Sequence, residues 1–188
     1  MTPGFETMEW LNEPPEHRVE GSSLILTTGE KTDFWQRSYY GLEEASGHFL
    51  YHALHADFAV ELTFDADYSA LYDQAGIMLR SGPLHWIKAG VEYTDGARAL
   101  SVVVTQTASD WSKTPLTDAG PVTLRLTRWQ DAVKIEHVTE GGAEMIRLCS
   151  FPEGRVEVGP MACSPKRGGL TARFDGFTLQ PDPPREIH

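Results

Sequence analysis

Several side chains suited to binding a polar small molecule lie close together in the chain between residues 72 and 106. They are an amide, two cations, an aromatic ring and a carboxylate: Gln74, Arg80, Lys88, Trp86 and Glu92. Aromatic rings stack on flat or ring-shaped ligands, and charged or amide groups form directed hydrogen bonds. We expect Trp86 to stack in an exposed groove. Arg80 and Lys88 would bind an anionic or hydroxyl group, and the amide and the carboxylate would exchange hydrogen bonds with the ligand.

A rim for this site is predicted from two further stretches. Trp35 and Arg37 lie in an irregular, aromatic segment at residues 31–40, and Asp110 and Trp111 lie in a polar loop at residues 108–116. A mixture of apolar walls and a few aimed polar groups is typical of ligand pockets. For the two tryptophans, packing against the edge of the core is the alternative interpretation.

Three consecutive antiparallel strands must position the central residues, because apolar and polar side chains alternate through residues 72–106. Asp95-Gly96 is typical of a two-residue hairpin turn. That turn sets Val91 opposite Leu100, so apolar residues meet apolar residues on one face. Met78 then joins the polar face beside the candidate site residues.

One row of the polar face has almost no side chains, since it consists of Gly76, Gly90 and Ser101. Glycine weakens a strand and often marks the close approach of another group. The row therefore predicts a depression that admits a ligand. The alternative is that the glycines only allow the sheet to curve, or accept the side chain of another strand.

Catalytic and metal-binding patterns are weak. Glycoside hydrolysis needs two carboxylates across a cleft, and the open face supplies only Glu92. Asp73 lies at a strand end, and Asp110 lies on a loop that could reach the rim. Lys88, two positions along the same face, favours an ionised structural pair with Glu92 over a general acid. His48 and His52 would lie about 13 Å apart on one strand, too far to share a metal ion. No catalytic residue, metal ion or cofactor is predicted.

Composition narrows the classes of partner. The net charge of −11 argues against nucleic acids and anionic membranes. The first residues lack the apolar stretch of a signal peptide, so a cytoplasmic protein is expected. Cys149 and Cys163 are far apart in sequence and are expected to be reduced, buried thiols, with a bridge between neighbouring strands as the alternative.

Ten or more short strands with regular turns and no long helix predict an all-β fold, a sandwich or jelly roll. Residues 1–180 are expected to form this single domain. The sequence PDPPREIH, residues 181–188, cannot continue a sheet and is expected to be a loose C-terminal tail.

The segments YDQAGIMLR (residues 72–80), WIKAGVEYTDG (86–96) and TDFWQRSYYG (32–41) resemble an uncharacterised family known as regulation of enolase, concanavalin A-like. GHFLYHALHADFAVEL, LSVVVT and SDWS extend the resemblance. It implies a concanavalin A-like jelly roll of two antiparallel sheets, one of them concave. The C-terminal sandwich domain of some β-xylosidases is similar, whereas the ExDxE strand of the related glucanases is absent.

Three hypotheses follow. The first is a non-catalytic, cytoplasmic jelly-roll domain that binds a small polar ligand, a saccharide or sugar derivative, on the concave sheet. The second is a regulatory protein that docks on a metabolic enzyme of carbohydrate metabolism, as the resemblance to the enolase-related family implies. The third is an enzyme that acts on glycosides.

Overall fold

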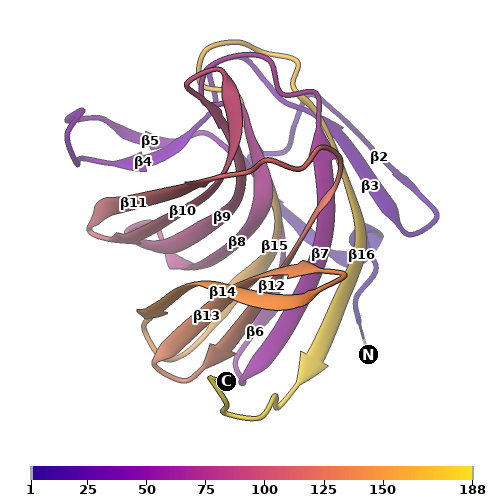
Figure 1. Ribbon diagram of the computed structural model, residues 1–188, viewed down its shortest axis with the longest axis vertical. Helices are drawn as coiled ribbons and strands as arrows, with labels where there is room; N and C mark the ends of the chain where they lie inside the picture. Colours follow the sequence, from indigo (N-terminus) through magenta and orange to yellow (C-terminus); the bar gives the residue numbers. More distant parts are fainter. Residues whose placement is uncertain (1, 188) are drawn as a thin grey trace.

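The computed structural model describes residues 2–187, which fold into two antiparallel seven-stranded sheets packed face to face (Figure 1). The first sheet has the order β1 (Glu9–Leu11), β6 (His48–Leu54), β15 (Val156–Cys163), β8 (Gln74–Gly82), β9 (His85–Thr94), β10 (Ala97–Gln106) and β11 (Ala108–Pro115). The second has the order β14 (Gly142–Ser150), β13 (Ala132–Thr139), β12 (Val122–Trp129), β7 (Phe58–Ala66), β16 (Thr171–Pro181), β3 (Ser23–Thr27) and β2 (Glu16–Glu20). The predicted all-β, concanavalin A-like sandwich is confirmed.

The core lies between the sheets and follows from strand alternation. Every second residue of each central strand points inward, as Ala75, Ile77 and Leu79 do from β8. Leu62 and Phe64 of β7 meet them from the second sheet and are almost fully buried. This burial fixes which face of β8–β10 points outward, and therefore where the candidate polar residues lie.

The predicted register of the central strands is confirmed. Val91 pairs with Leu100 across the Asp95-Gly96 turn, and Met78 pairs with Lys88 between β8 and β9. A bulge after Arg80 lets β8 extend to Gly82.

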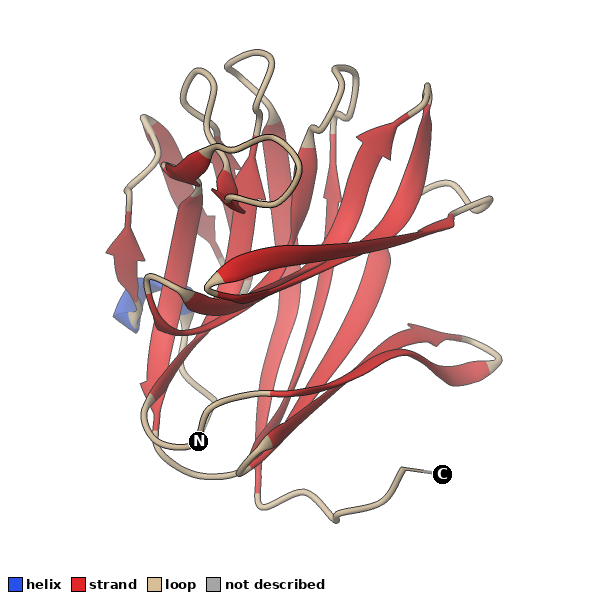
Figure 2. Cartoon of the chain, turned by 90° about the vertical axis from the view of Figure 1, so that its left-hand side faces the viewer, coloured by secondary structure: helices blue, strands red, loops and turns tan. Residues whose placement is uncertain are grey.

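Two segments differ from expectation. The polar loop predicted at residues 108–116 is edge strand β11, which pairs with β10 along its length. The irregular segment at residues 31–40 contains β4 (Phe34–Gln36), which forms a short hairpin with β5 (Glu43–Ala45). In Figure 2 this β4–β5 hairpin lies in front of the first sheet, on the face turned away from the second sheet. Sequence alternation could not show this, because a three-residue strand carries too little pattern.

The ends of the chain depart slightly from expectation. Near the N-terminus a 3₁₀ turn, η1 (Phe5–Thr7), precedes β1. Residues 183–187 form no strand, but they are held: Trp129 Nε1 donates to the Pro184 carbonyl over 3.1 Å. Met1 and His188 lie outside the described residues.

Within residues 2–187 no helix is long and apolar enough to cross a membrane. Both cysteines are free; Cys163 is buried, as expected, and Cys149 is only partly buried. Burial raises the pKa of the Cys163 thiol strongly, so this thiol stays protonated at neutral pH.

Candidate functional site

The outer face of the first sheet carries a second buried cluster beneath the β4–β5 hairpin. Phe34 of the hairpin packs on Trp86, with ring centroids 6.0 Å apart, and Met78 is completely buried beside them. The expectation that Trp86 lies in an exposed groove is wrong, since only 1% of this residue is exposed. Strand alternation predicted the correct face for Trp86, but the hairpin covers the end of the sheet where Trp86 lies. Met78 and Trp86 thus anchor the hairpin and do not face a ligand.

A cavity of about 280 Å³ remains between the hairpin and the other end of this face. We call it the hairpin cavity. It is lined by Lys31, Asp33, Trp35, Tyr40, Leu42, Glu44, Tyr72, Gln74, Lys88, Glu92, Val103, Trp111, Pro165 and Lys166. Of the predicted site residues, the structure brings together Trp35, Gln74, Lys88, Glu92 and Trp111.

An ion pair forms one part of the cavity floor. The Lys88 ammonium lies 3.0 Å from Asp33 Oδ1, and the Gln74 amide donates to the same oxygen over 3.3 Å. Lys88 is 5% exposed. Burial alone would lower the pKa of Lys88, but the Asp33 carboxylate, with Cys163 and Glu92, outweighs burial and raises that pKa. Lys88 therefore stays charged and ties the hairpin segment to the sheet.

A second polar chain begins at Trp111. Its indole Nε1 donates to Ser101 Oγ over 2.9 Å, and the Ser101 hydroxyl donates to Glu92 Oε2 over 2.6 Å. This chain fixes the tilt of the Trp111 ring and leaves the other Glu92 oxygen available. Burial raises the pKa of Glu92 against the opposing effects of Lys88 and the Ser101 hydroxyl. In the described chain Glu92 forms no ion pair, because Lys88 is engaged by Asp33; the predicted Lys88–Glu92 pair is wrong.

Aromatic rings form the walls of the cavity. Trp35 and Tyr40 of the hairpin segment meet edge to face, with centroids 5.7 Å apart. Tyr72 and Trp111 lie on the sheet side, also edge to face at 6.4 Å. The hydroxyl oxygens of Tyr40 and Tyr72 are 3.0 Å apart, so they join the two walls. The cavity is therefore bordered by rings from the hairpin and from the sheet.

Besides Met78 and Trp86, three more predicted residues lie outside the cavity. Arg37 is exposed at the hairpin tip and pairs with Glu43 over 2.6 Å. Arg80 pairs with Glu157 at the far end of the sheet. Asp110 is the strand neighbour of Trp111, so it points to the opposite face of β11 and pairs with Arg147 over 3.4 Å. The expectation that these residues contribute to the site is therefore wrong, and Asp110 cannot act as the partner acid of Glu92.

The glycine row also lies outside the hairpin cavity. A Cβ atom on Gly76 would come within 2.0 Å of the Ala89 carbonyl oxygen, and one on Gly90 within 2.1 Å of the Ala75 oxygen. The strands' own backbones occupy that space. The ligand-admitting depression does not fit the structure at this row, and the close approach of neighbouring backbone explains why both positions are glycine.

Sequence reasoning missed Asp33, Tyr40, Tyr72 and Lys166 in the cavity lining. Asp33 and Tyr40 belong to the segment expected to be irregular, and its charged, aromatic composition was the available signal. Nothing in that composition shows which face the segment covers. Lys166 lies in the turn before β16 and its ammonium stands 5.8 Å from the centroid of the Tyr72 ring.

His48 lies outside the hairpin cavity, and the described residues include no cluster suited to a metal ion. No group of three or more His, Cys, Asp or Glu side chains within residues 2–187 is arranged to hold a metal ion. His48 is buried beside Asn12 and Gly29: its Nδ1 lies 2.6 Å from the Asn12 carbonyl, and Nε2 accepts from the Gly29 amide over 2.9 Å. These contacts hold the segment before the hairpin against β6.

Comparisons with known proteins agree with this architecture. The model of the family described as "Protein of unknown function (DUF1349)" matches residues 10–182. The Saccharomyces cerevisiae protein named "Regulation of enolase protein 1" is 38% identical over 182 residues, covering 95% of this chain and 92% of that protein. A crystal structure of a functionally unknown protein from Saccharomyces cerevisiae has a TM-score of 0.93 and 37% identity, covering 97% of this chain and 100% of the yeast chain.

A more distant likeness concerns the fold alone. The xylan β-1,4-xylosidase from Bacillus halodurans has a TM-score of 0.63 and 14% identity, covering 93% of this chain and 38% of the xylosidase. The expected resemblance to the sandwich domain of β-xylosidases is thereby confirmed at the level of architecture.

Proposed function

The chain belongs to the DUF1349 family, and we propose that within it this protein is a non-catalytic domain that binds a small polar ligand, a saccharide or sugar derivative. The hairpin cavity is the proposed site. The observation that carries the proposal is the convergence of a buried ion pair, a buried carboxyl group and four aromatic rings on one cavity of about 280 Å³.

Size and polarity support this ligand class. Ligand pockets usually measure about 300–1,000 Å³, so this cavity suits one sugar ring better than a longer chain. The charge of Lys88 is balanced by Asp33, while Gln74 and Glu92 add donors and acceptors. Such a floor offers directed hydrogen bonds to hydroxyl groups, and the aromatic walls suit the apolar faces of a sugar ring.

The carboxylates favour binding over turnover. Asp33 is engaged by Lys88 and Gln74, and Asp110 points to the other face of the sheet. A glycosidase needs one proton donor and one free carboxylate aimed at the same bond. Glu92 is suited to the first role. For the second, Asp33 is held by Lys88 and Gln74, which leaves Glu44 of the hairpin as the other carboxylate of the lining.

The test is a thermal-unfolding screen against monosaccharides, sugar phosphates and sugar acids, followed by calorimetric titration of each hit. A ligand at about 100 times its Kd adds ~2.7 kcal/mol of stability, which raises Tm measurably. Trp111→Leu should abolish the hit, and Glu92→Gln should weaken binding about fivefold through one altered hydrogen bond.

The matched control is Glu61→Gln, which alters a carboxylate of the second sheet outside this cavity and should leave binding unchanged. Failure of all compounds to raise Tm, or hits that survive both cavity variants, would overturn the proposal.

A second candidate is a regulatory protein that docks on a metabolic enzyme. The name of the yeast relative, at 38% identity, favours it and points to enolase as the first enzyme to try. Either role would place the protein in the cytoplasm. This candidate is tested by immobilising the chain on a sensor surface and measuring the binding of purified enolase. Absence of binding at micromolar enolase would exclude a stable complex of the two proteins.

A further inference from the structure

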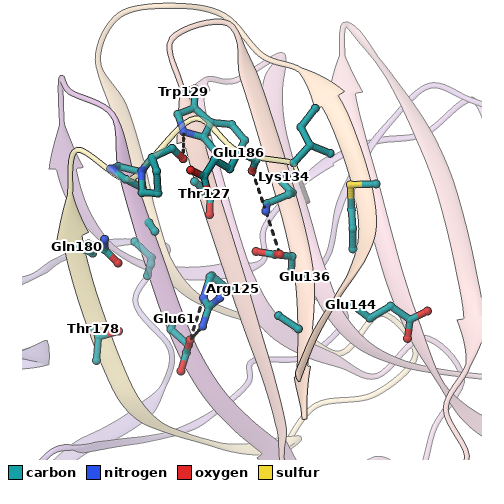
Figure 3. A pocket seen from close by; sticks show the side chains of 17 residues that line it. Glu61, Arg125, Thr127, Trp129, Lys134, Glu136, Glu144, Thr178, Gln180 and Glu186 are labelled. Atoms are coloured by element: carbon teal, nitrogen blue, oxygen red, sulfur yellow. Dashed lines mark hydrogen bonds and ion pairs between the residues drawn. The ribbon is translucent and has the colours of Figure 1, made fainter. Parts of the chain in front are cut away.

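The outer face of the second sheet carries a larger cavity, of about 710 Å³, at the other side of the sandwich (Figure 3). We call it the outer groove. Its floor is formed by β7, β12 and β13, β14 and β16 form its sides, and residues 183–187 run along one border. The charged side chains of the floor are already paired: Arg125 with Glu61 over 2.8 Å, and Lys134 with Glu136 over 3.0 Å.

The segment at residues 182–187 is held in this groove mainly through its backbone. Trp129 Nε1 donates to the Pro184 carbonyl over 3.1 Å, and Lys134 Nζ donates to the Glu186 carbonyl over 3.3 Å (Figure 3). Arg185, between them, pairs with Asp131 over 3.1 Å. Two alternate carbonyls and one basic side chain are therefore recognised, while the remaining side chains of the segment make none of these contacts.

This pattern suits an extended segment that contains proline. Proline fixes φ and restricts the residue before it, so such a segment loses little entropy when it binds. Aromatic-lined grooves read proline-rich segments through their extended backbone. Here the indole N–H of Trp129 provides the hydrogen bond, and Trp129 itself is only 4% exposed with the segment in place. The groove also extends beyond the segment toward Met145, which is 42% exposed.

We propose that the outer groove is a docking site for an extended segment of a partner protein that carries two prolines followed by a basic residue. Residues 182–187 of the chain itself occupy the groove in cis and compete with the partner. A short tether gives an effective concentration in the millimolar range, so the chain's own segment masks the groove until it is displaced. This site is distinct from the hairpin cavity and does not depend on its ligand.

The experiment uses the full chain and a synthetic peptide, Pro-Asp-Pro-Pro-Arg-Glu-Ile, capped at both ends. Binding is followed by the indole N–H resonance of Trp129, assigned through Trp129→Phe. In a full chain carrying Pro183→Gly with Pro184→Gly, the weakened cis segment should lower the apparent Kd of the peptide at least tenfold relative to the unaltered chain.

Two controls preserve the fold. A peptide with Glu in place of Arg should bind at least fivefold more weakly, and Asp131→Ala, at a largely exposed position, should weaken the original peptide to a similar degree. If the Trp129 resonance does not move with millimolar peptide in either chain, the proposal is wrong. Dimerisation that moves the resonance without peptide would assign the groove to a second copy of the chain and would also overturn it.

Discussion

The two outer faces of the sandwich differ in how their charged groups find partners. On the first sheet, Lys88 pairs with Asp33, which lies 55 positions away in sequence and reaches the sheet only because the β4–β5 hairpin folds over it. On the second sheet, Lys134 pairs with Glu136 of the same strand. The outer groove is the larger cavity, about 710 Å³ against 280 Å³, yet its floor is neutralised by neighbours within the sheet.

The comparison shows that cavity volume is a poor guide to binding chemistry. A chain segment that covers a cavity, which we call its roof, excludes water from it. A hydrogen bond or ion pair is stronger where the surroundings are less polar. The hairpin cavity has such a roof, and Glu92 within it is 6% exposed. The outer groove is bordered by a short segment and recognises backbone carbonyls. On this comparison we assign the proposed small-ligand site to the first face and the proposed docking site to the second.

The largest expected effect comes from removing the anchor of the roof. Phe34→Ala deletes a side chain that is 2% exposed and packed on Trp86, so it should lower the free energy of unfolding by about 3–4 kcal/mol. Pro184→Ala, at the exposed border of the other cavity, should change it by less than about 0.5 kcal/mol. Urea unfolding measures both, and equal effects would contradict the distinction between roof and border.

Breaking each ion pair sharpens the comparison. Lys88→Met leaves the Asp33 carboxylate partly buried without its cation, and should lower the free energy of unfolding by about 2–3 kcal/mol. Lys88→Met combined with Asp33→Asn should recover part of this loss, because no uncompensated charge remains.

Lys134→Met is the matched change on the second sheet. Its partner Glu136 is only 8% exposed, so this change also leaves a buried carboxylate without its cation, and the loss should again be about 2–3 kcal/mol. A loss below about 1 kcal/mol for Lys134→Met, measured by the same urea titration, would contradict this account.

Glu92→Gln should stabilise the chain at neutral pH, whereas the substitutions above destabilise it. Burial raises the pKa of Glu92 above its usual 4.5, so the carboxyl group contributes stability below pH 4.5 that is lost as pH rises through the folded-state pKa. The neutral amide should therefore raise the Tm at pH 7 and flatten the dependence of Tm on pH above 4.5. Melting curves at several pH values check this, with Glu136→Gln as the control that should not stabilise the chain. A fall in Tm for Glu92→Gln at pH 7 would contradict it.

Most of the fold and part of the hairpin cavity could be predicted from sequence. The Asp95-Gly96 turn determines the register, and the register correctly placed Gln74, Lys88 and Glu92 on one face. These are local consequences of strand alternation and turn geometry. Trp111 was expected near the site for a different reason, as a loop residue, and reaches it as part of β11.

The parts of the site that could not be predicted from the sequence depend on a non-local contact. Alternation gives the face on which Trp86 lies, but it cannot show that Phe34, 52 positions earlier, covers it. The same hairpin brings Asp33 to Lys88 and so decides that Glu92 is left without an ion pair. The prediction for Asp110 was wrong because residues 108–116 were assigned to a loop. In a strand, consecutive side chains point to opposite faces, so Asp110 points away from the face that carries Trp111.

The smallest expected effect concerns the hydrogen bond that joins the two walls of the hairpin cavity. Tyr72→Phe removes the contact with the Tyr40 hydroxyl and should lower the free energy of unfolding by about 0.5 kcal/mol, since the pair is partly exposed. The Tyr40 hydroxyl, together with partial burial, raises the pKa of Tyr72 to about 12. The contribution of this tyrosine should therefore be complete below about pH 10 and lost as pH rises through about 12.

Urea unfolding of Tyr72→Phe and the unaltered chain from pH 8 to pH 12 measures this difference. Trp129→Phe removes the donor to the Pro184 carbonyl on the other face. Its stability difference from the unaltered chain should stay constant over this pH range, because an indole N–H does not titrate there. A stability difference for Tyr72→Phe that stayed constant to pH 12 would mean that the hydroxyl contact does not hold the hairpin wall to the sheet wall. The hairpin would then be held by its other contacts, among them those of Phe34 and Lys88.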